Sequence, residues 1–209
     1  MRLPGRHHHR ALLAAGLLAL LPAAGAGQRL GVFFDEQATS CADTIEPNVC
    51  GIRRVYIVAF PDGDFQVTGV LLRLELPAEL EVCPDPGLLC PGFTRCTWSG
   101  DLTAESGLDV QFFPCLPAGE STVIMSFDVW ANSRGDDLVL HLAGTPQDST
   151  ADHLRPRLKK CNPDDPEGNL GLVDATASDA FLNCTRNCVC TSAIETRTWG
   201  AVKTLFQGR

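Results

Sequence analysis

Hydrophobic and polar positions alternate with a period of two along several stretches of the chain, which is typical of β-strands with one buried face. Residues 67–76 show the pattern clearly, because aliphatic positions from Val70 onward alternate with arginine and glutamate. The same alternation recurs in residues 108–113, 121–130 and 137–143. We expect a half-buried strand in each of these four stretches.

Residues 53–60 differ because both of their alternating faces are apolar, as in a strand that is covered on two sides. Turn-forming residues separate the strands, and they predict a tight turn at 61–64 and a loop at 114–119. The polar, proline-rich stretch 149–170 predicts a long surface loop tethered by Cys161. Several strands separated by turns predict an all-β fold, namely an antiparallel β-sandwich.

The C-terminus is the one convincing stretch with helical spacing of apolar residues. Thr198 is suited to cap a short helix over about residues 198–206, and the apolar face of that helix would carry Trp199, Val202, Leu205 and Phe206. This face either closes the core of the sandwich itself or docks on a partner.

The first 26 residues have the three parts of a secretory signal peptide. Arg2, Arg6 and Arg10 precede an unbroken apolar run at 11–21, and a small-residue cleavage site follows at 24–26. The apolar run is shorter than the roughly 20 residues that a membrane span needs. We therefore expect one mature domain, 27–209, that is secreted, periplasmic or displayed at the cell surface, with no membrane span.

Charge narrows the range of partners. The chain has 209 residues, with 17 lysines and arginines against 25 acidic residues and a formal net charge of -8. Removing the signal leaves 14 basic residues against 25 acidic ones, which is a charge of -11. An acidic protein repels phosphate backbones, so nucleic acid is not an expected partner.

All ten cysteines belong to the mature chain, and an even number in an exported protein predicts up to five disulfides. Their positions are Cys41, Cys50, Cys83, Cys90, Cys96, Cys115, Cys161, Cys184, Cys188 and Cys190. Spacing suggests a short loop closed by Cys41 and Cys50 and one disulfide-dense region at 83–96. Cys188 and Cys190 are too close to bond comfortably with each other, so each is expected to reach elsewhere.

A metal cluster is the alternative interpretation of the last three cysteines, Cys184, Cys188 and Cys190. Their spacing lacks the paired Cys-x2-Cys units of zinc ribbons, and neither His141 nor His153 is near them in sequence. The sequence therefore favours disulfides, and no metal or other cofactor is predicted.

Motifs for catalysis are scarce. Outside the signal only His141 and His153 could serve as an imidazole base, and the sequence has no Gly-x-Ser-x-Gly elbow. The acidic loop 162–169 offers oxygen ligands for calcium but departs from the EF-hand spacing, and turn chemistry explains the same residues. We predict that the protein is not an enzyme.

Two further features are candidates for a modification site and for a ligand contact. Asn183-Cys184-Thr185 matches the short sequence that accepts N-linked glycans. Among the few aromatic residues, Trp98 is the most plausible exposed one, and it is our candidate for contact with a ligand.

The mature chain also resembles an uncharacterised family of secreted proteins from uncultured environmental bacteria. The matching segments are 31–35, 55–58, 67–70, 113–115, 180–184 and the Trp-Gly-Ala-Val-Lys ending within 198–206. Cys83, Cys90 and Cys96 are additional to the family pattern. The resemblance implies no activity, cofactor or site residue.

The expected sandwich is similar to immunoglobulin-like, adhesion, cohesin-type and carbohydrate-binding domains, a likeness of fold that does not by itself imply function. We therefore predict a monomeric, exported, non-catalytic structural or recognition module with a protein or glycan partner. One alternative is a carbohydrate-binding or carbohydrate-active protein that uses Trp98. Another is a disulfide-rich protease inhibitor that presents the loop from Cys83 to Cys96.

Overall fold

The computed structural model describes residues 28–47, 51–61, 65–84, 87–90, 93, 95–146, 155–161, 171–185 and 188. The expected signal peptide, the acidic loop 162–169 and the expected C-terminal helix lie outside these residues. Within the described part, no helix is long and apolar enough to cross a membrane.

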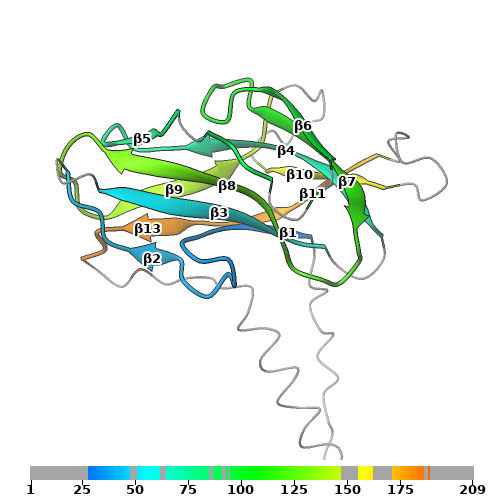
Figure 1. The fold of residues 1–209 in the computed structure, drawn as a ribbon, viewed down its shortest axis with the longest axis horizontal. Coiled ribbons are helices and arrows are strands. Elements are labelled where there is room, and N and C mark those ends of the chain that lie inside the picture. The colour runs from blue at the N-terminus through cyan, green and yellow to red at the C-terminus, as the bar shows by residue number, and fades with distance from the viewer. Residues whose placement is uncertain are drawn as a thin grey trace, which may run out of the picture.

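Thirteen strands form the regular structure of the described residues (Figure 1). They are β1 (Arg29–Phe33), β2 (Ala42–Asp43), β3 (Ile52–Phe60), β4 (Val67–Glu75), β5 (Leu80–Val82), β6 (Arg95–Gly100), β7 (Leu108–Leu116), β8 (Thr122–Ala131), β9 (Leu138–Ala143), β10 (Arg157–Lys160), β11 (Leu172–Asp174), β12 (Thr176–Ser178) and β13 (Ala180–Leu182).

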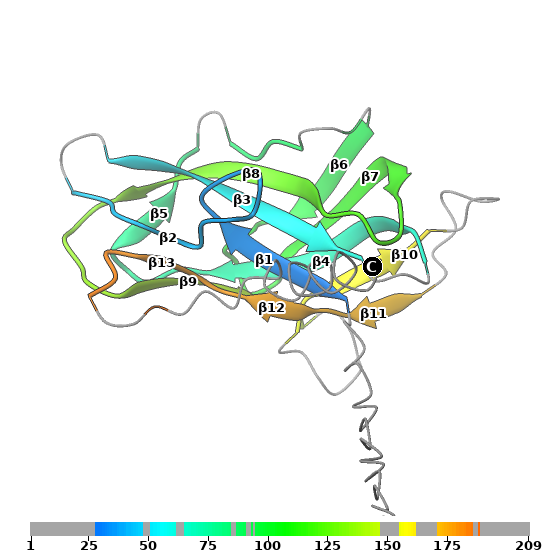
Figure 2. The same ribbon diagram turned by 90° about the horizontal axis from the view of Figure 1, so that it is seen from below.

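The strands form two sheets that pack as a sandwich (Figures 1 and 2). One sheet has the order β12-β1-β3-β8-β5, and the other has the order β11-β10-β4-β9-β13-β2, with β7 on β4 and β6 on β7. This confirms the predicted all-β sandwich. Most strand pairs are antiparallel, as predicted, but the sheets are mixed, because β12 pairs parallel with β1 and β13 pairs parallel with β2.

The core lies between the sheets and follows the predicted alternation. On β3, Val55 and Ile57 are fully buried, and on β4 the same holds for Val70 and Leu72. Burying these aliphatic side chains is the main favourable term that holds the two layers together. The strands predicted from alternation all form, with bounds that move by a few residues at most.

The loop predicted at 114–119 begins later than expected, because β7 continues to Leu116. Leu116 lies opposite Val67 and is only 3% exposed, so the core holds this part of the chain. The register between β4 and β7 shifts between Val67 and Gly69, which lets β7 take up additional residues before it pairs again.

The long loop predicted at 149–170 contains a strand, β10, which pairs with β4 on one side and β11 on the other. The side chain of Leu158 is fully buried between the sheets. Its charged neighbours point to the outer face, where Arg157 pairs with Asp174 and Lys159 pairs with Asp109. The hydrophobic pattern did not predict this strand, because a segment with one apolar residue and three cations is typical of a solvated loop.

Lys159 is the most buried cation of the described residues, with a side chain that is 7% exposed. Its ammonium lies 2.5 Å from the carboxylate of Asp109 on β7, and its aliphatic chain passes over Gly69 on β4. A Cβ at Gly69 would meet the carbonyl oxygen of Val110 and the chain of Lys159. The glycine thus leaves room for an ion pair that joins β10 to β7 across β4.

We predict that Asp109→Ala lowers the free energy of unfolding by about 2–3 kcal/mol, because it leaves the ammonium of Lys159 buried without a counter-charge. Urea unfolding measures this change. The control is Glu75→Ala, which removes the exposed partner of Arg73 and should cost less than about 1 kcal/mol. Equal losses in the two variants would contradict the role given to Asp109.

Candidate functional site

β6 is the longest strand at an open sheet edge in the described structure. It pairs with β7 along its whole length, from Arg95 opposite Phe113 to Gly100 opposite Leu108, and with no other described strand. The strand lies at the upper margin of the ribbon in Figure 1. An open edge exposes backbone donors and acceptors that can pair with another chain.

The hydrogen-bond pattern shows which backbone groups of β6 point outward. Just past the strand, the N–H of Asp101 donates to the carbonyl of Gly107 at 3.1 Å, which makes this a hydrogen-bonded pair. Since such pairs alternate along an antiparallel ladder, Arg95, Thr97 and Ser99 also bond to β7. The backbone groups of the residues between them, Cys96, Trp98 and Gly100, point away from β7. We call these outward groups the β6 edge.

Trp98 stands in the middle of the β6 edge and is 46% exposed. Its side chain leaves the strand on the same face as that of Val110, which lies opposite it and is fully buried. The sequence expectation that Trp98 is exposed agrees with the structure, and its contact with a ligand stays a prediction.

The segment before β6 is fixed by three contacts. Cys96 forms a disulfide with Cys90, and the ring of Phe93 stacks on Phe112 with 4.5 Å between ring centroids. Leu89 adds a two-way backbone bridge to Ser126 on β8. This segment therefore ties the β6 end of one sheet to the other sheet.

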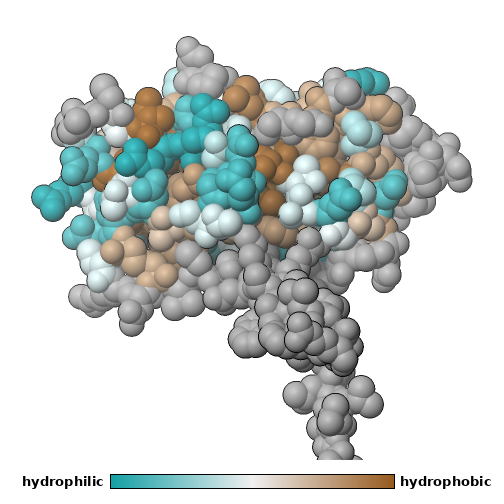
Figure 3. Space-filling model, turned by 60° about the horizontal axis from the view of Figure 1, so that its bottom comes forward, coloured by the Kyte–Doolittle hydropathy of each residue, from teal (hydrophilic) through white to brown (hydrophobic). Residues whose placement is uncertain are grey.

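Other large hydrophobic side chains are exposed in separate places. Ile52 on β3 lies opposite Trp130 on β8, at 49% and 41% exposure. Phe113 lies on β7 at 47% exposure. On the face seen in Figure 3, hydrophilic and hydrophobic areas alternate among the coloured residues. The β6 edge is distinct from these patches because it combines an aromatic side chain with backbone groups that no described strand pairs.

Three disulfides join six of the described cysteines, and a further described cysteine, Cys41, is also disulfide-bonded. The three pairs are Cys90–Cys96, Cys115–Cys161 and Cys184–Cys188. Disulfides of this kind are typical of oxidising compartments. Cys50, the partner that spacing suggests for Cys41, lies outside the described residues, as does Cys190.

Cys83 is a free, buried thiol, unlike the disulfide expected there. Its N–H donates to the carbonyl of Asp128 at 2.8 Å, which continues the pairing of β5 with β8 and holds Cys83 against that strand. The two other cysteines of the region, Cys90 and Cys96, bond to each other. Burial raises the pKa of the Cys83 thiol, and the charge of Asp128 raises it further.

The ligand atoms of Asp137, Cys184 and Cys188 lie within 4.8 Å of one another, the one such group of potential metal ligands in the described part. The two sulfurs are bonded to each other, and a metal requires thiolates. The carboxylate of Asp137 instead accepts hydrogen bonds from the N–H and hydroxyl of Thr185, at 2.7 to 3.0 Å. At Cys184 and Cys188 the structure agrees with the disulfide interpretation.

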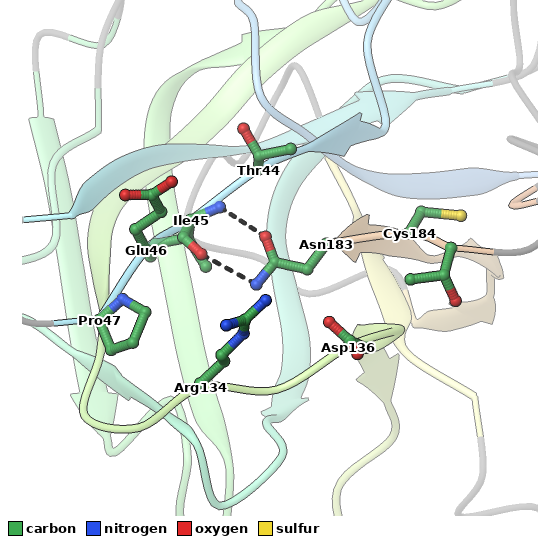
Figure 4. A pocket seen from close by; sticks show the side chains of 9 residues that line it. Thr44, Ile45, Glu46, Pro47, Arg134, Asp136, Asn183 and Cys184 are labelled. Carbon is green, nitrogen blue, oxygen red and sulfur yellow. Dashed lines mark hydrogen bonds between the residues drawn. The ribbon is translucent and has the colours of Figure 1, made fainter.

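Asn183, the first residue of the glycan-acceptor sequence, acts as a clamp between segments (Figure 4). Its amide nitrogen donates to the carbonyls of Ile45 and Gly135, both at 2.9 Å, and its oxygen accepts from the N–H of Ile45 at 2.8 Å. Asn183 has a φ of 54°, a conformation that asparagine tolerates better than most residues. Both amide hydrogens are thus already used.

The clamp borders an open groove of about 570 Å³ (Figure 4). The groove is lined by Thr44, Ile45, Glu46, Pro47, Arg134, Asp136, Asn183, Cys184 and Thr185. The lining contains acidic, basic and uncharged side chains, so its chemistry does not indicate one class of ligand.

His141 lies on the outer face of β9, and its Nδ1 is 2.6 Å from a carboxylate oxygen of Asp179. Such a pair can orient an imidazole for proton transfer. Neither the Asn183 groove nor a second groove beside β4 and β5 includes either residue among its described lining. His153 lies outside the described residues.

No family model matches the chain, and no curated protein matches it. Solved structures similar to it include a non-cellulosomal cohesin from Archaeoglobus fulgidus, at 11% identity and TM-score 0.46 over 78% of this chain and 94% of that one.

A type II cohesin domain from the cellulosome of Acetivibrio cellulolyticus is similar at 14% identity and TM-score 0.47, covering 75% of this chain and 95% of that one. A cohesin module from a Clostridium perfringens family 33 glycoside hydrolase is similar at 8% identity and TM-score 0.44, covering 76% and 98%. These similarities assign no ligand or site residue to this chain.

We predict that Cys83 reacts slowly with iodoacetamide in the folded protein and rapidly in denaturing urea. Because its pKa is raised, the thiolate fraction at a given pH is below that of a free cysteine, and labelling should rise only at higher pH. Mass spectrometry of the labelled peptide measures this, and non-reducing digestion of the same sample maps the three disulfides. Rapid labelling of the native protein at neutral pH would contradict the prediction.

We predict that Asn183→Ala destabilises the fold by about 2–3 kcal/mol, because three hydrogen bonds are lost and alanine is strained at a positive φ. Asn183→Gly loses the same hydrogen bonds without the backbone strain, so it should lose less. Thermal unfolding followed by circular dichroism compares the two variants. If neither variant unfolds earlier than the parent, Asn183 is not a clamp.

Proposed function

We propose that the protein is a non-catalytic recognition module that acts outside the cytoplasm and binds a protein partner by adding a strand at the β6 edge. The observation that carries this proposal is the open edge itself. Cys96, Trp98 and Gly100 direct their backbone groups away from β7. β6 has six residues, and among the described strands it pairs with β7 alone.

An extended polypeptide is the ligand class that fits this edge. Alternating N–H and C=O groups along a strand are matched by the same groups of a second strand, and this supplies affinity with little dependence on side chains. Trp98 adds a side chain of large apolar area at the centre of the contact, where aromatic residues often dominate binding energy.

The disulfides support a site of action in an oxidising compartment. The expected signal peptide at 1–26 is consistent with export to the periplasm, the medium or the cell surface. Nothing in the described structure favours the carbohydrate or protease-inhibitor alternative over a protein partner.

The edge proposal predicts that a phage-displayed library of random linear peptides yields clones that bind the folded chain through β6. Trp98→Pro is the discriminating variant, because it removes an outward N–H and the indole but leaves the bonds to β7 in place. Selected clones should lose at least about tenfold in affinity for this variant, since one edge hydrogen bond and a central aromatic contact are lost.

Trp130→Ala is the matched control, since Trp130 is similarly exposed but belongs to β8. Circular dichroism and thermal unfolding establish that both variants are folded. The proposal fails if no clone is selected, or if the selected clones bind the parent chain and Trp98→Pro equally well.

A further inference from the structure

The sequence around Trp98 is complementary to itself when it is laid antiparallel. Arg95 and Asp101 each stand three positions from Trp98, on opposite sides of it. An antiparallel copy that places Trp98 opposite Trp98 therefore places Arg95 of each chain opposite Asp101 of the other. Opposite charges on directly facing residues stabilise an antiparallel pair, and like charges destabilise it.

The backbone agrees with the same register. In an antiparallel ladder, the residues that exchange hydrogen bonds must both direct their N–H and C=O groups toward the partner. The outward residues of β6 are Cys96, Trp98 and Gly100. With Trp98 at the centre, Trp98 faces Trp98 and Cys96 faces Gly100, so every outward residue meets an outward residue. A shift by one position pairs outward residues with inward ones and loses these bonds.

We propose that β6 docks against β6 of a second copy of this chain, antiparallel and centred on Trp98. This deepens the proposed function, on which it rests, by naming the partner of the β6 edge, and it departs from the sequence prediction of a monomer. The contact is isologous, so each chain contributes the same residues, and pairing closes after two copies.

The net charge of the chain opposes this contact only weakly. The mature chain, 27–209, carries a formal net charge of -11, but at physiological ionic strength the repulsion between exposed charges is largely screened beyond about 8 Å. Arg95 and Asp101 act within that distance. The N–H of Thr103 donates to Asp101 at 2.8 Å, and this bond, with that from the Thr103 hydroxyl, lowers the pKa of the carboxyl. Asp101 is therefore ionised at neutral pH.

The test is sedimentation velocity of the full mature chain over concentrations up to about 1 mM, where an association free energy as small as about 4 kcal/mol is detected. We expect reversible dimers that weaken at least about tenfold in R95D and in D101R, because both charged contacts become repulsive in each variant. The double variant R95D/D101R restores opposite charges and should recover dimers. An equimolar mixture of R95D and D101R should form heterodimers for the same reason.

R134D is the matched control, because Arg134 is an exposed arginine away from β6 and its replacement changes the net charge equally. Since Asp101 also binds Thr103, thermal unfolding of each variant establishes that it is folded. If D101R is unstable, the comparison of R95D with R134D keeps the test decisive.

A chain that sediments as a monomer at all concentrations overturns the second-copy proposal, as does equal weakening by R95D and R134D. The two proposals fail in different ways. If library peptides bind through β6 while the chain stays monomeric, the recognition edge stands and only the second copy is wrong. If Trp98→Pro alters neither peptide binding nor sedimentation, both proposals are wrong.

Discussion

The structure depends on one constraint, which is that every backbone donor and acceptor of a strand must find a partner unless the strand lies at an edge. β4 shows how the constraint organises the larger sheet. Its first part is paired by β10 and β7, and its last part, from Arg73 to Glu75, is paired by β9. β4 therefore fixes the positions of three strands that are far apart in sequence. Among the described strands the same requirement is left unmet on the outward side of β6, and the proposed binding of a strand there rests on it.

Much of the sandwich could be predicted because burial imposes a period of two on strands with one buried face. The strands that the pattern missed are short or charged, and β10 is the clearest case. Leu158 alone faces the core there, and the ion pairs that let Lys159 lie in a sheet come from residues distant in sequence. The parallel pairings of β12 and β13 were missed for a related reason, since period alone says nothing about strand direction.

The candidate site was only partly predictable. Trp98 stood out as an exposed aromatic residue, but residues 95–100 were not predicted as a strand because they carry few apolar residues. The outward direction of their backbone depends on the register with β7, which is a property of the folded chain. Cysteine pairing was likewise beyond the sequence. In the structure Cys83 is free, whereas Cys90 and Cys96 bond to each other.

The two parallel pairings have a consequence for the order in which the chain can fold. β12 and β13 are near neighbours in sequence, yet β12 completes one sheet beside β1 and β13 joins β2 in the other. The first two strands to be synthesised therefore wait for residues 176–182 before their pairings are complete. Contacts between such distant segments are slow to form, because a long loop must close first. When the chain emerges in sequence, both sheets stay incomplete until residues 176–182 are available. Until then the unfolded chain can still pass through a narrow channel as an extended polypeptide.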